Sequence, residues 1–168
     1  MKYQRFEDLP VWQAAIEFGA RIFALTAKPC FRGNGDLRNQ LERASLSISN
    51  NIAEGFERGT TQELLTFLYI SRGSAGESRS MICFIERLPV FCDLKPELSD
   101  LKSRAESISR QLRGWADSLQ NSDIKGTRYL TDKVRSKALS EKERKEFLEE
   151  LRRVTEENIE RSQGKAAK

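Results

Sequence analysis

The chain has 168 residues, of which 38% are hydrophobic and 32% charged, and this balance predicts one globular domain with at most a small appendage. It contains no histidine, which excludes Ser-His-Asp and Cys-His nucleophiles, histidine proton shuttles and zinc sites that use histidine. Three cysteines, an odd number without a CxxC pair, favour reduced thiols and a cytoplasmic location. The N-terminal residues are charged, and no run approaches the roughly 18 apolar residues of a membrane span, so we expect neither a signal peptide nor a membrane segment.

Two helices are expected in the first third of the chain. Apolar residues recur every three or four positions over residues 8–28, as on one face of an amphipathic helix, and Asp8 can cap its start. A glycine-containing turn then leads to Asp36, a good N-cap. The second helix is therefore expected to start at Asp36 and to end in the region that Gly55 and Gly59 mark.

Two further helices are expected before residue 120. Thr60 and Glu63 have the spacing of a capping box, which predicts a helix that runs to about Leu88. A fourth helix is expected to begin near Pro96, because proline suits a first helical turn. Four helices of this length form a complete antiparallel up-down bundle over residues 1–120, so the predicted fold class is all-α.

The expected third helix is apolar on two sides. Heptad spacing places Ser71, Ser74 and Ser78 on a stripe of large apolar residues, where a second backbone can approach closely. A second stripe on another side contains Ile70, Glu77, Phe84 and Phe91. A surface helix of a small monomer does not need two apolar sides, so this helix either is central or is covered by another subunit.

A polar cluster is expected inside the bundle. Asn51 shares a heptad position with Leu37 and Ala44, which directs its amide toward the core, where a polar group needs a partner. The candidate partners are Glu54, Arg72 and Glu77. We interpret these four residues as a structural cluster that fixes helix register rather than as a catalytic carboxylate pair.

The positive charge is concentrated after the predicted bundle. The net charge is +1 over residues 1–120, +3 over 121–139 and zero over 140–168. The candidate nucleic-acid-binding residues of this basic linker are Lys125, Arg128, Lys133, Arg135 and Lys137. Two interpretations are open: a solvated linker, or an arm that contacts phosphates.

Residues 140–168 are expected to form a charged C-terminal helix with a frayed end. Ser140 and Glu143 have capping-box spacing, and the apolar stripe that follows is narrow. Docking on the bundle, self-association and binding of a partner are all open for this extension.

Several segments of the predicted bundle resemble a known family signature. They are Leu9–Trp12, Arg43–Ser45, Ser47–Gly55, Phe67-Leu68 and Arg72–Glu77. They resemble a bacterial four-helix-bundle family that includes 23S rRNA intervening-sequence proteins and the accessory variability determinants of diversity-generating retroelements. The resemblance covers about residues 6–120 and implies a non-enzymatic bundle that assembles into a ring-like homopentamer. In the retroelement branch, it implies binding to a reverse transcriptase and its template RNA.

Two functions remain after these exclusions. The first is an oligomeric adaptor that associates with RNA or single-stranded DNA, or with a reverse transcriptase, through the basic linker. The second is a protein-interaction scaffold of the intervening-sequence type that binds no nucleic acid directly. An enzyme is not expected, because the sequence contains no glycine-rich phosphate loop, metal-ligand cluster or nucleophile motif, and we expect no cofactor and no metal.

Overall fold

A computed structural model describes residues 3–121 and 144–153 of the chain. Its bundle contains α1 (Pro10–Thr26), α2 (Gly35–Glu57), α3 (Thr61–Ile85) and α4 (Lys95–Gln120). Short 3-10 segments precede α1, α2 and α4, at Phe6–Asp8, Pro29–Phe31 and Pro89–Leu94. A separate helix covers residues 144–153, which belong to a second compact unit of the chain. The described residues contain no strand, so the all-α prediction is confirmed.

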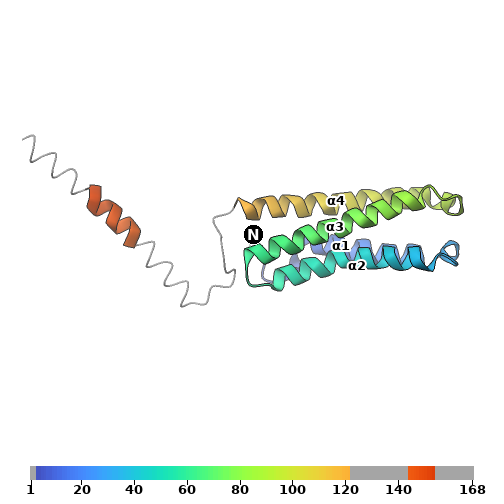
Figure 1. The fold of residues 1–168 in the computed structure, drawn as a ribbon, viewed down its shortest axis with the longest axis horizontal. Coiled ribbons are helices and arrows are strands. Elements are labelled where there is room, and N and C mark those ends of the chain that lie inside the picture. Colours follow the sequence, from blue (N-terminus) through green and yellow to red (C-terminus); the bar gives the residue numbers. More distant parts are fainter. Residues whose placement is uncertain (1–2, 122–143, 154–168) are drawn as a thin grey trace, which may run out of the picture. The chain divides into compact units, whose positions relative to one another are not determined.

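The four long helices pack as a bundle (Figure 1). Successive helices are connected at alternate ends, so neighbours in sequence run antiparallel. Helix α2 packs against α1 and α3, and α4 packs against α3 and α1. Helices α1 and α3 are consequently diagonal to each other, and their outer faces lie on different sides of the bundle.

The helix boundaries follow local chemistry, with three differences from prediction. The start of α3 is as predicted: the Thr60 hydroxyl accepts a hydrogen bond from the Glu63 amide at 3.2 Å. Asp8 does not cap α1, because it lies in the preceding 3-10 turn, and Pro10 begins the helix. Helix α2 starts one residue before Asp36, and α3 ends at Ile85 because the residue before Pro89 is extended.

All four helices contribute to one apolar core. Its largest fully buried side chains include Phe18, Ile22, Leu41, Ile48, Leu64, Leu68, Ile82 and Leu98. Phe31 and Phe91, from two connecting segments, pack against each other with ring centroids 4.6 Å apart. The contact between the two rings covers one end of the core with segments that are not long helices.

Helices α2 and α3 approach closely along the predicted serine stripe. The buried Ser71 hydroxyl donates a hydrogen bond across the interface to the Ile48 carbonyl at 2.8 Å. Further along, a Cβ added at Gly55 would lie 2.6 Å from the Cβ of Phe67. Such a contact is too short for any side chain, so only glycine permits this backbone separation.

The substitution Gly55→Ala should therefore lower the free energy of unfolding by about 1–3 kcal/mol, because the added methyl group overpacks the interface. Gly114 of α4 is the matched control, since an added Cβ there has nothing within 4 Å. Gly114→Ala should raise stability by about 0.5–1 kcal/mol through helix propensity. Chemical denaturation measures both variants, and equal changes would contradict the close approach.

Asp100 connects α4 to α1 at the bundle surface. Its Oδ2 accepts hydrogen bonds from Arg104 at 2.8 Å and from Arg21 at 2.6 Å. The hydrogen bond from Arg104, together with the charges of both guanidinium groups, lowers the pKa of Asp100 below its ordinary value. The ionised carboxylate is thus favoured in the folded state.

A lowered carboxyl pKa stabilises the fold above the unfolded-state value of about 3.9, and this contribution is lost as the pH falls through the folded-state pKa. Asp100→Asn should reduce stability near neutral pH and make the acid limb of the stability curve shallower. The control is Asp93→Asn, in the Pro89–Leu94 segment and outside the ion pairs of the described residues. Denaturation midpoints measured from pH 7 down to acid values check this, and identical curves for Asp100→Asn and wild type would contradict it.

Candidate functional site

The predicted polar cluster around Asn51 is not formed. Asn51 is half-buried, and its amide nitrogen donates to the carbonyl and the hydroxyl of Ser47, at 2.6 and 3.0 Å. Glu54 is exposed and pairs with Arg58 at 2.6 Å, along the same helix. The prediction was wrong because residues four positions apart on a helix are neighbours and satisfy each other locally.

The other two cluster residues lie on different sides of α3. Arg72 and Glu77 are five positions apart, which corresponds to a rotation of roughly 140° around an α-helix. Neither forms a hydrogen bond or ion pair with Asn51 or Glu54 among the described residues. The four residues therefore do not act as one cluster, and Glu77 belongs to a different site.

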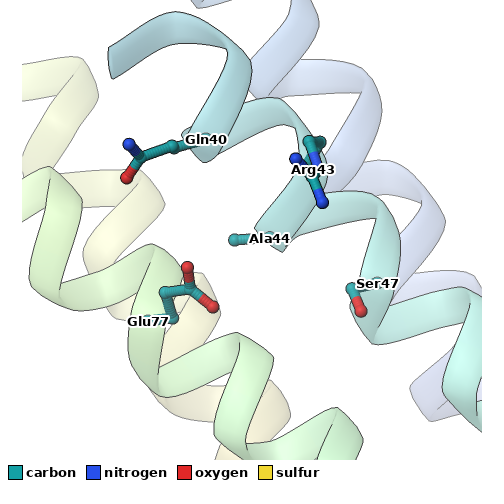
Figure 2. A pocket seen from close by; sticks show the side chains of 5 residues that line it. All are labelled: Gln40, Arg43, Ala44, Ser47 and Glu77. Carbon is teal, nitrogen blue, oxygen red and sulfur yellow. The ribbon is translucent and has the colours of Figure 1, made fainter. Parts of the chain in front are cut away.

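Glu77 lines a polar groove between α2 and α3 (Figure 2). The groove has a volume of about 420 Å³ and is also lined by Gln40, Arg43, Ala44 and Ser47. Ala44 is buried, whereas the Arg43 and Glu77 side chains are exposed and form no ion pair within the described chain. The two linked segments of the family signature meet in this groove.

The groove is lined by groups that form hydrogen bonds and ion pairs. It offers a guanidinium, a carboxylate, an amide and a hydroxyl group, and the Ser47 hydroxyl accepts a hydrogen bond from Asn51 instead of contacting a base. Over residues 3–121 and 144–153, no group of three or more Cys, Asp or Glu side chains could hold a metal ion. Charge and hydrogen bonding are the chemistry that this groove can supply.

Helix α3 carries an exposed apolar surface beside the groove. Ile70 and Phe84 remain 47% and 55% exposed, one heptad on each side of Glu77. Gly73 lies between them, with open space where a Cβ would be. We call Ile70, Gly73, Glu77 and Phe84 the α3 stripe. Phe91 was expected to continue it, but the helix has already ended, and Phe91 is buried against Phe31.

A second exposed apolar surface lies over α1 and α2. Ile16, Phe23 and Leu46 are 41% to 42% exposed, and Cδ2 of Leu46 is 3.9 Å from the position of a Cβ on Gly19. Leu46 thus covers α1 between Ile16 and Phe23, which makes the three side chains one surface, the α1 patch. Ile16 and Phe23 are among the apolar residues whose spacing predicts this helix, and the structure leaves both of them outside the core. The available signal was that α1 contains only two charged residues, Glu17 and Arg21.

The predicted basic residues lie outside the described part of the chain. They are Lys125, Arg128, Lys133, Arg135 and Lys137. Of the predicted C-terminal extension, residues 144–153 are helical, and Phe147, Leu148 and Leu151 are exposed on this helix.

A family model for the 23S rRNA-intervening sequence protein matches residues 7–114. The chain belongs to this family. The match includes α1, α2, α3 and most of α4, together with the groove, the α3 stripe and the α1 patch. Residues 115–168 lie beyond it.

No curated protein matches the chain. Within the described ranges, no helix is both long and apolar enough to cross a membrane. The family places the molecule among small helical proteins.

Proposed function

We propose that this intervening-sequence protein is a non-enzymatic, homo-oligomeric adaptor that associates with nucleic acid, a reverse transcriptase, or both. The observation that carries the proposal is the pair of exposed apolar surfaces, the α3 stripe and the α1 patch, on diagonally opposed helices. Exposed apolar surface of this kind favours association, because its burial removes hydrocarbon from water.

The placement of the two surfaces supports a ring. If the α3 stripe of one copy covers the α1 patch of the next, each copy uses two different surfaces, and such head-to-tail contacts close into a ring. Gly73 in the stripe lacks a side chain that would keep a second helix away. The resemblance to the retroelement branch supplies the expected number of five subunits.

Nucleic-acid association rests on the basic linker. Each copy carries the excess of three positive charges in residues 121–139, and a ring of five would present five such segments. Weak phosphate contacts gain strength when several are made by one assembly. RNA or single-stranded DNA is the proposed ligand, and binding to nucleic acid in the cytoplasm agrees with the free thiols of the three cysteines.

A protein-interaction scaffold without nucleic-acid binding is the second candidate. The exposed Phe147, Leu148 and Leu151 on the helix at 144–153 favour it, because they offer an apolar stripe to a partner protein. Pull-down experiments with and without residues 140–168 separate the two candidates.

The ring predicts a defined result from two assembly variants. The first double variant, Ile70→Gln with Phe84→Gln, replaces the apolar side chains of the α3 stripe. The second, Phe23→Gln with Leu46→Gln, replaces two of the three apolar side chains of the α1 patch. Each double variant should be monomeric by light scattering, whereas wild type should have five times the mass of one chain. Mixing equal amounts of the two variants should give a dimer, because one intact stripe then meets one intact patch.

Val90→Gln is the control, since Val90 is 58% exposed but lies in the connection before α4. It should assemble like wild type. A monomeric wild type would overturn the oligomer. Failure of the mixture to form dimers would overturn the head-to-tail contact alone.

Neutralising the basic linker should weaken RNA binding. When all five cations of this segment are changed to Gln, the affinity for a single-stranded RNA should fall. The plot of log affinity against log salt should also become less steep, by roughly 0.7 for each phosphate that the variant no longer neutralises. Fluorescence anisotropy over a salt series measures both quantities. If wild type does not bind RNA at low salt, the nucleic-acid role is wrong and the scaffold role remains.

A further inference from the structure

The pairing of α3 with α4 has a register that two side-chain contacts define. The Gln120 amide donates to the Tyr69 hydroxyl at 2.8 Å, and Lys102 pairs with Glu86 at 2.7 Å. The helices are antiparallel, so moving one heptad forward on α3 corresponds to moving one heptad back on α4 (Figure 1). The register identifies which residues face each other along the rest of the interface.

Arg72 and Arg79 occupy the same heptad position as Glu86. Since Glu86 contacts α4, this position faces α4 along the helix. Lys102 of α4 neutralises Glu86. In the register of this pair, the α4 residue that faces Arg79 is Ser109, and the one that faces Arg72 is Ala116. Arg72 is half-buried and Arg79 is exposed, and neither has an ion pair with any described residue. The Tyr69–Gln120 contact places Asp117, the residue after Ala116, opposite Arg72, but Asp117 pairs with Arg113 of its own helix. The pairing of opposite charges between α3 and α4 therefore stops after one step in the described residues.

A third arginine reaches the same place from α4. Gly76 lies one heptad after Tyr69 on α3, and Arg113 lies one heptad before Gln120 on α4. Gly76 and Arg113 therefore face each other, as Tyr69 and Gln120 do. An added Cβ at Gly76 would have nothing within 4 Å. Arg113 is 3.6 Å from Asp117 through Nε, which leaves its two terminal nitrogens outside that ion pair. The register thus places three arginines around Gly76.

The neighbouring acids do not neutralise this group. Glu106 pairs with Arg110 at 2.8 Å, and Asp117 is the partner of Arg113 alone among the described residues. Counting these two acids against Arg72, Arg79, Arg110 and Arg113 leaves two positive charges on this face. The surplus is local, because the bundle as a whole has a net charge of only +1.

We propose that Arg72, Arg79 and Arg113, the arginine row, bind successive phosphates of a single RNA strand beside Gly76. Guanidinium groups bind phosphate oxygens in a bidentate manner, and a glycine lets a backbone come close. Arg72 and Arg79 are about 10 Å apart along the helix axis at 1.5 Å per residue, so they can contact different phosphates of one strand. The inference rests on the proposed nucleic-acid role and adds a bundle site to the linker.

The position of the row supports joint action with the linker. Helix α4 ends at Gln120, one turn beyond Ala116, which the contact between Lys102 and Glu86 places opposite Arg72. The basic residues 121–139 follow directly in sequence. A strand bound along the arginine row would therefore end close to the point where the basic segment begins.

The test uses the full chain and a single-stranded RNA in fluorescence anisotropy over a salt series. Arg72→Gln with Arg79→Gln and Arg113→Gln should weaken binding by roughly tenfold or more, and the log–log salt slope should decrease by about 2, at 0.7 per phosphate. The control is Arg32→Gln with Lys95→Gln, two exposed cations outside the ion pairs of the described residues and distant in sequence from the row. This control should lower the slope by far less.

Thermal melting and light scattering of the arginine variant should match wild type, which separates weaker phosphate binding from impaired folding or assembly. Unchanged affinity and slope in the arginine variant, with binding abolished in the linker variant, would overturn this inference and leave the proposed function standing. Equal weakening in the arginine variant and its control would also overturn it, because nonspecific charge would then explain the effect. A wild-type chain that does not bind RNA would overturn this inference together with the proposed nucleic-acid role.

Discussion

The separation between α2 and α3 is the constraint on which the surfaces of this bundle depend. Gly55 against Phe67, and the hydrogen bond from Ser71 to the Ile48 carbonyl, bring the two backbones together over about two turns of α2. This close contact fixes the rotation of α3 about its own axis. With that rotation set, Glu77 faces the groove, and Arg72 and Arg79 face α4.

Helix α3 consequently has different chemistry on each of its sides. Small residues and serines contact α2, the stripe with Ile70 and Phe84 is exposed, and arginines line the boundary with α4. A helix with this division cannot turn by even one residue, about 100°, without burying arginines or exposing core residues. The same packing that stabilises the bundle therefore positions the surfaces that we propose for a second copy and for a polyanion.

The sequence was sufficient to predict the helices and the closely packed serines, because periodicity and capping are local properties. The capping box at Thr60 and the close approach of another backbone at Ser71 follow from patterns within one helix. The structure shows that this backbone belongs to α2. The Asn51 cluster could not be predicted correctly, since choosing between a partner on the same helix and one on α3 requires the distance between the helices. Exposure of Ile16 and Phe23 was missed for a related reason: an apolar stripe alone does not say whether a fold or an assembly covers it.

Net charge is a poor guide to where this protein would meet a polyanion. The bundle is almost neutral because most of its cations are neutralised one by one, by partners such as Glu54 for Arg58 and Glu86 for Lys102. The cations that matter for an external ligand are those that the register leaves opposite serine, alanine and glycine. Since a phosphate competes with no internal carboxylate at Arg72 or Arg79, binding there costs no existing ion pair. A nearly neutral bundle can therefore hold a selective anion site, and the register of its helices, rather than its composition, decides where.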